Sequence, residues 1–235
     1  MIAIIDHRMP ASAMNKLTDL GFELMLMPSA GYLDTPVSAH PDMLIFNGWG
    51  KLFCHDRYFN DNSDLIEKIV NALGLDLTLS NEHTNENYPH DVLFNCVALG
   101  DNLLCNTKTV SRLILQEAQS RKVNVIHTNQ GYTKCSVCRV SDNAVITADA
   151  SIHKACAERG IDSLLVCADG VTLSGYDCGF IGGATGSDNE NIYFCGDISL
   201  HPDGDKIIEF CKRHKKSVIS LTDEELYDVG SIFFV

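Results

Sequence analysis

Residues 101–127, DNLLCNTKTVSRLILQEAQSRKVNVIH, contain the pattern that decides the fold. An apolar run at their start predicts a strand, the spacing of apolar residues after Val110 predicts an amphipathic helix, and Val123–Ile126 predicts a closing strand. Another apolar strand precedes each such stretch. Similar stretches recur at roughly 45-residue spacing, which lies within the range of repeat architectures. They occupy residues 1–27, 51–79, 142–167 and 190–221. Within residues 51–79, Gly74 is expected to end the helix, and Asp64 with Glu67 resembles a capping box at its start.

The two ends of the chain complement each other. Residues 1–27 supply only one strand before their helix, and the C-terminal run Gly230–Val235 supplies an apolar strand without a partner. We expect the two to pair, because propellers protect their sheet edges by joining their ends. The expected fold class is therefore α/β, a single domain over residues 1–235 built as a five-bladed α/β propeller of ββαβ repeats. In a closed ring, the functional site is expected on the axis.

Composition excludes several classes of protein. A formal net charge of -13 disfavours a nucleic-acid-binding surface. No stretch approaches the ~18 continuous apolar residues of a membrane span. The chain begins directly with a strand and shows no signal peptide, and its 10 cysteines then suggest a reducing compartment. We expect a cytoplasmic protein without nucleic-acid or membrane partners, and homo-oligomer formation stays open.

Cys135 and Cys138 form a C-x-x-C sequence. On an extended strand, positions three apart point to opposite faces, so the two thiols cannot share a metal without a turn. The chain offers no second pair of ligands with metal-site spacing, which leaves zinc as the less favoured alternative. We expect no metal and no cofactor.

Polar residues cluster just before the first strand of each repeat. A hydrophobic core needs none of them, and aspartate is rarely buried without a partner. A cluster of Asp, His and Cys on the axis predicts shifted pKa values and a site for a small cationic ligand. The alternative is that each aspartate only caps a turn through its side chain. The candidate ligand-binding residues are Asp42, Asp91, Asp177, Asp228, Lys134 and Cys178.

These repeats, the aspartates before the first strands of repeats two and three, and the closure of the chain on its own N-terminus resemble the pentein superfamily of guanidino-group-modifying enzymes. The run Pro89–Phe94 is similar to Gly-Gly-Asp-Val-Leu-Phe of dimethylarginine dimethylaminohydrolases. Asp42 falls where that family has the aspartate of a Phe-x-x-Asp segment, and Asp177–Cys178 falls near an Asn-Cys pair. The resemblance implies a cysteine nucleophile, a histidine acid/base and carboxylates that hold a guanidinium group.

The sequence departs from that pattern at two places. Where the family has its histidine, before the first strand of repeat four, stand Tyr132, Thr133 and Lys134, and residues 230–235 contain no cysteine. One hypothesis is a divergent amidinohydrolase or deiminase, with Cys135 activated by the neighbouring Lys134 ammonium. In that case the acid/base candidates are His40 and His90. The other hypothesis is a catalytically inactive pentein that binds a ligand or a protein.

Overall fold

The computed structural model describes residues 1–235. Short strands form five three-stranded sheets, and seven α-helices lie between them in the chain. The strands of these sheets are β1 (Ile2–Asp6), β2 (Glu23–Met27), β3 (Ile45–Gly48), β4 (Lys51–His55), β5 (Asp76–Ser80), β6 (Val97–Leu99), β7 (Asn102–Cys105), β8 (Asn124–His127), β9 (Val137–Ser141), β10 (Ala144–Thr147), β11 (Asp162–Leu165), β13 (Thr185–Ser187), β14 (Asn191–Phe194), β15 (Ser217–Ser220) and β17 (Phe233–Phe234).

The five sheets share one internal order: β17-β1-β2, β3-β4-β5, β6-β7-β8, β9-β10-β11 and β13-β14-β15. In each, the inner hairpin strand is antiparallel to the middle strand, and the middle strand is parallel to the outer one. A small additional parallel pair joins β12 (Val171–Thr172) to β16 (Leu226–Tyr227). The predicted repeat of hairpin, helix and closing strand is therefore present in the structure.

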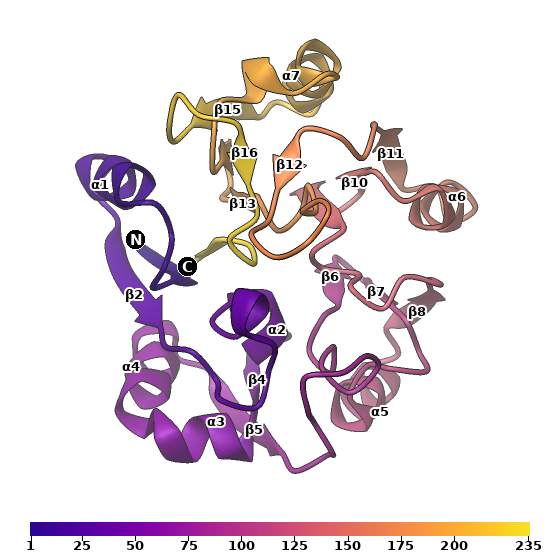
Figure 1. The fold of residues 1–235 in the computed structure, drawn as a ribbon. Helices are drawn as coiled ribbons and strands as arrows, with labels where there is room; N and C mark the ends of the chain where they lie inside the picture. The colour runs from indigo at the N-terminus through magenta and orange to yellow at the C-terminus, as the bar shows by residue number, and fades with distance from the viewer.

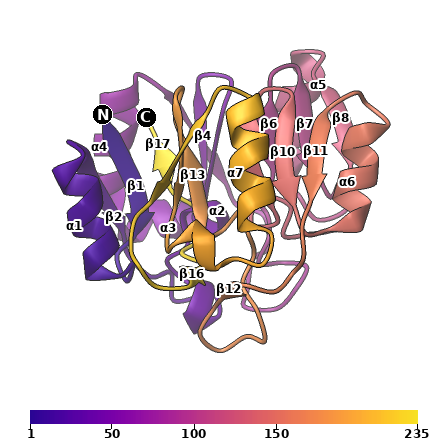
Figure 2. The same ribbon diagram turned by 90° about the horizontal axis from the view of Figure 1, so that it is seen from above.

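The crossover helices occupy the outside of the molecule. A parallel pair of strands needs a crossover connection, and in every unit a helix supplies it. Figure 1 shows the five sheets around a common centre with these crossover helices at the periphery and the short helix α2 near the centre, and Figure 2 shows the crossover helices upright beside the strands. The helices are α1 (Ala11–Asp19), α2 (Pro41–Leu44), α3 (Asp56–Asp61), α4 (Ser63–Leu73), α5 (Arg112–Ser120), α6 (Ala150–Ala157) and α7 (Gly204–Arg213).

The two termini meet in one sheet, as the sequence predicted. β17 is antiparallel to β1 with Ala3 opposite Phe234, and the Ile2 amide donates to the Val235 carbonyl at 2.7 Å. The five sheets remain separate, since no ladder of hydrogen bonds continues from one into the next. Between neighbouring inner strands there is one isolated parallel bridge, Gly186 with Ile232. β13 and β17 therefore run in the same direction along the centre.

Helix α4 illustrates how far local sequence determines an element. Its end at Gly74 is confirmed, because Gly74 has φ +60 and its amide caps the last turn. The predicted capping box of Asp64 with Glu67 is wrong. The N-cap is Asn62, which makes no side-chain capping bond to α4. Its side-chain amide donates to the Tyr58 carbonyl of α3 at 3.1 Å, since α3 ends immediately before α4.

The core consists of apolar layers between the helices and their sheets and between neighbouring sheets. All ten cysteines are free, and most are buried as small apolar side chains. Cys54, Cys105 and Cys195 are buried at equivalent places near the ends of the middle strands of three sheets. No helix combines the length and the apolar character that crossing a membrane requires.

Candidate functional site

Asp42 is the most deeply buried acid of the centre. The short helix α2 precedes β3 and places Asp42 on the axis, where it is 0% exposed. The Ser231 hydroxyl donates to Asp42 Oδ2 at 2.7 Å, while Asp42 Oδ1 is buried without a hydrogen-bond partner. A buried carboxylate with a free acceptor is unfavourable, so this oxygen is a position where a donor would be stabilised.

Asp91 occupies the equivalent place in the next unit. The Tyr132 hydroxyl donates to Asp91 Oδ2 at 2.5 Å, and Asp91 Oδ1 is also buried without a partner. Burial raises the pKa of Asp91, and the Tyr132 hydrogen bond and the charge of His90 oppose that rise. The Tyr132 ring stacks against Phe180, with ring centroids 5.9 Å apart. Asp91 is therefore bonded to one ring of a stacked aromatic pair, Tyr132 and Phe180.

Asp228 and His40 form a third buried group. Asp228 accepts the backbone amides of Phe180 and Gly230, both at 2.9 Å. His40 lies between two acids, with Nδ1 3.8 Å from Asp228 Oδ1 and Nε2 3.9 Å from Asp6 Oδ2. Burial raises the pKa of Asp228, and the charge of His40 opposes the rise. Arg8 already neutralises Asp6 through three side-chain hydrogen bonds.

Lys134 is linked to the acids through a serine. Its Nζ donates to Ser231 Oγ at 2.6 Å, and Ser231 in turn donates to Asp42. Burial lowers the pKa of the Lys134 amine, and the negative charge of Asp42 counteracts this. Ser231 has φ +71, a left-handed conformation that is strained for a residue other than glycine. The preceding Gly230 lies so close to His40 that a Cβ would meet the histidine Cβ at 2.1 Å.

Cys135 has an environment that favours the neutral thiol. It is 3% exposed, and the Asn95 side-chain amide donates to its sulfur at 3.0 Å. Burial raises the pKa of Cys135 well above its ordinary value, and the charges of Asp42 and Asp228 raise it further. The Lys134 amine is directed to Ser231, so it does not form the ion pair with Cys135 that would stabilise a thiolate.

The remaining candidates from the sequence are exposed. His90 is solvent-accessible, and its ring packs on His83 with centroids 4.8 Å apart. Asp177 and Cys178 are also exposed, on the loop before Gly179. The structure thus brings His40, Asp42, Asp91, Asp228, Lys134 and Cys135 together around the centre and leaves His90, Asp177 and Cys178 outside this buried group.

A pocket of about 260 Å³ opens onto the buried group, at the end of the molecule where the inner strands begin. We call it the acidic pocket. Asp177 and Cys178 form part of its rim, and Asp228 is its buried carboxylate. No group of three or more His, Cys, Asp or Glu side chains is arranged to hold a metal ion. Its lining residues include His40, Tyr132, Cys135, Tyr176, Phe180 and Asp228.

Three residues of this region were missed by the sequence analysis: Asn95, Tyr132 and Ser231. Asn95 Oδ1 accepts the amides of Lys134 and Cys135, at 2.6 and 3.2 Å, and so fixes the turn before β9. Asn95 could have been noticed in the sequence, because it is a polar residue within the otherwise apolar run 92–99. Ser231 stands in the same situation before β17.

Three solved structures show what this fold is similar to. A dimethylarginine dimethylaminohydrolase mutant from Pseudomonas aeruginosa, complexed with citrulline, matches with a TM-score of 0.59 and 10% identity over 93% of this chain and 91% of that one. Agmatine deiminase of C. jejuni matches at 0.51 and 9% identity over 94% and 75%. An amidinotransferase of saxitoxin biosynthesis from Microseira wollei matches at 0.53 and 9% over 93% and 87%.

A comparison with curated proteins by sequence finds no match. One family model matches residues 4–233, almost the whole chain, and its description is a family of unknown function, DUF6873. The chain belongs to this family, and its fold is that of the guanidino-group-modifying enzymes, the pentein superfamily.

Proposed function

We propose that the protein binds a small guanidino compound, or a similar small cation, in the acidic pocket. The observation that carries the proposal is the buried carboxylate of Asp228, which lines the pocket beside the rings of Tyr132 and Phe180. Asp42 and Asp91 do not line the pocket, but both are buried, Asp91 is bonded to the pocket residue Tyr132, and each keeps one oxygen without a partner. Carboxylates are the groups that hold a planar guanidinium through paired hydrogen bonds. The two unpartnered atoms are Asp42 Oδ1 and Asp91 Oδ1.

The walls of the pocket suit a planar cation. Tyr132 and Phe180 stack at its side, and aromatic faces attract cations electrostatically. Asp228 lines the pocket and adds negative charge, although both of its oxygens already accept backbone amides. The Tyr132 hydroxyl covers Asp91. A ligand N–H group would replace that hydroxyl as the donor to Asp91.

The similar structures support ligands of this kind. One dimethylarginine dimethylaminohydrolase is complexed with citrulline, and another forms an adduct with S-methyl-L-thiocitrulline.

We also propose that the five sheets are the blades of a closed propeller. The common strand order and the β1–β17 pairing support this description. Closure predicts that deletion of residues 230–235 abolishes cooperative unfolding, as followed by circular dichroism during a urea titration.

A second candidate function is hydrolysis of the guanidino group, because Cys135 and His40 both line the acidic pocket. The raised pKa of Cys135 disfavours it, since the thiolate is the nucleophile in such reactions. Turnover assays for ammonia, urea or methylamines, with Cys135→Ser as the control, test this candidate. A guanidino compound that is bound but not converted would leave binding as the function.

The binding proposal is tested by calorimetric titration with arginine, agmatine, methylarginines and citrulline. We expect at least one guanidino compound to bind, and Asp91→Asn to weaken its affinity about ten-fold or more because a charge-assisted hydrogen bond is lost. The matched control is Asp223→Asn, since Asp223 is exposed. The proposal is overturned if no compound binds at millimolar concentration, or if both variants bind as the unchanged protein does.

A further inference from the structure

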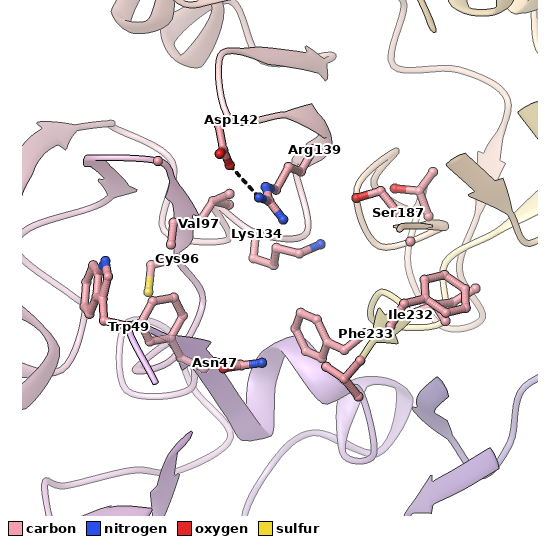
Figure 3. Close-up of a pocket in the computed structure, with 17 residues that line it drawn as sticks. Asn47, Trp49, Cys96, Val97, Lys134, Arg139, Asp142, Ser187, Ile232 and Phe233 are labelled. Carbon is pink, nitrogen blue, oxygen red and sulfur yellow. Dashed lines mark hydrogen bonds and ion pairs between the residues drawn. The ribbon is translucent and has the colours of Figure 1, made fainter. Parts of the chain in front are cut away.

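A second pocket, of about 350 Å³, lies at the opposite end of the axis (Figure 3). We call it the donor pocket. The acidic pocket is formed where the inner strands begin, whereas the donor pocket is formed where those strands end and turn into their hairpins. Its lining includes Asn47 of β3, Trp49 of the following turn, Ser187 of β13 and Phe233 of β17.

Lys134 is a half-buried donor of this pocket. Its backbone lies with the acids of the axis, but its side chain reaches into the donor pocket. An ammonium group has three donors, and only the bond to Ser231 is made within the protein. No carboxylate lies within 4.0 Å of Nζ, so Lys134 makes no direct ion pair, although the Phe233 ring lies 5.6 Å from it.

Other donors line the same pocket. Arg139 uses one nitrogen to contact Asp142 at 2.6 Å, which leaves most of its five N–H donors unused. The indole nitrogen of Trp49 is buried without a partner. Figure 3 shows the polar ends of Lys134, Arg139 and Asn47 directed toward the space between them. The pocket lining thus holds two basic groups, Lys134 and Arg139, on a chain of net charge -13.

We propose that the donor pocket binds a small organic carboxylate. The carboxylate group would accept from Lys134 and Arg139, and the apolar part would lie against the aromatic rings of Phe46, Trp49 and Phe233. The volume is at the lower end of the range for small-molecule sites. This site is separate from the proposed guanidino site and does not depend on it.

The chain provides its own reporter for this proposal, because Trp49 is its single tryptophan and lines the pocket. Hexanoate, which does not absorb where tryptophan is excited, would be titrated while Trp49 fluorescence is recorded. Hexanamide has the same apolar chain without the charge and serves as the matched control ligand. We expect a saturable change with hexanoate and at least about ten-fold weaker binding of hexanamide.

Two variants locate the effect. Lys134→Met keeps the length of the side chain and removes its charge, and it should weaken hexanoate binding about ten-fold or more. Lys212→Met is the control, because Lys212 is exposed on α7, outside the pocket, and should change nothing. If Lys134→Met does not fold, Arg139→Gln takes its place with the same expectation. The proposal is overturned if hexanoate gives no saturable change, if hexanamide binds equally well, or if the folded variant binds hexanoate as tightly as the unchanged protein.

Discussion

The acidic pocket and the donor pocket lie on the same axis and carry opposite kinds of group. At the first, the Asp228 carboxylate accepts two backbone amides, and behind the pocket lining Asp42 and Asp91 each keep a buried oxygen without a donor. At the second, Lys134, Arg139 and Trp49 supply donors, and the indole N–H lacks an acceptor. The difference shows that one repeated unit creates two sites, because its inner strand presents different residues at its start and at its end.

The two ends are connected by one chain of hydrogen bonds. Lys134 donates to Ser231, and Ser231 donates to Asp42, so a hydroxyl separates a half-buried ammonium from a buried carboxylate. The two charges stabilise each other through this bridge, since an isolated charge is expensive to bury.

The largest effect is expected from Asp42→Asn. The ammonium of Lys134 then loses its compensating charge, and we expect the free energy of unfolding to fall by about 3 kcal/mol. The double variant Asp42→Asn with Lys134→Met should recover part of this loss because both charges are absent. Urea unfolding followed by circular dichroism measures both, with Asp223→Asn as the surface control. If the double variant is less stable than the sum of the single changes predicts, the two charges do not compensate each other.

The next effect concerns thiols at the acidic end. Cys178 is exposed and Cys135 is buried with a raised pKa, so iodoacetamide should modify Cys178 about 100-fold faster at neutral pH. Mass spectrometry of the native protein after timed labelling measures the two rates, and buried Cys156 serves as the slow reference. Fast labelling of Cys135 would identify it as an activated nucleophile and would support the hydrolase candidate.

A smaller effect is expected at the bridge itself. Ser231→Ala and Ser231→Gly both remove the hydroxyl, but only glycine adopts φ +71 without strain. The glycine variant should therefore be more stable than the alanine variant by about 1 kcal/mol, although both should be less stable than the unchanged protein. Equal stabilities of the two variants in thermal or urea unfolding would show that the backbone at this position relaxes.

The smallest effect is on the pH dependence of stability. Burial raises the pKa of Asp91 in the folded protein, so the folded state binds its proton more tightly than the unfolded state. Asp91 therefore contributes stability that is lost as pH rises from about 4 through its folded pKa. Asp91→Asn should remove this part of the decline, because the asparagine side chain does not titrate. Unfolding curves between pH 4 and 8 measure the difference, and a steeper decline in the variant would contradict the raised pKa.

Much of the fold followed from the chain alone. Apolar spacing predicted the crossover helices and closing strands, and Gly74 ended α4 where expected. The pairing of Gly230–Val235 with the N-terminal strand was predicted because each segment lacked a partner, and β17 pairs with β1. The failed capping box at Asp64 has a local cause, since α3 occupies the residues where a free N-terminus was assumed.

The candidate site was predictable only in part. The acids that precede the inner strands were visible as polar residues where a core needs none, and three of the four aspartates are buried at the centre. His90, Asp177 and Cys178 come from the same kind of segment before an inner strand, but their side chains are exposed. The donor pocket had no sequence signal, since Trp49, Arg139 and Phe233 come from three separate hairpins.

The sequence by itself determined the local elements and their fivefold order, because helix and strand periodicity depends on neighbouring residues. Only the tertiary structure decided which groups are charged partners. Lys134 follows Thr133 and precedes Cys135 in the chain, yet its amine contacts Ser231, 97 residues away, and leaves the thiol neutral. The burial of Cys135 and the direction of the Lys134 side chain keep the thiol neutral, and both depend on the packing of segments that are distant in the sequence.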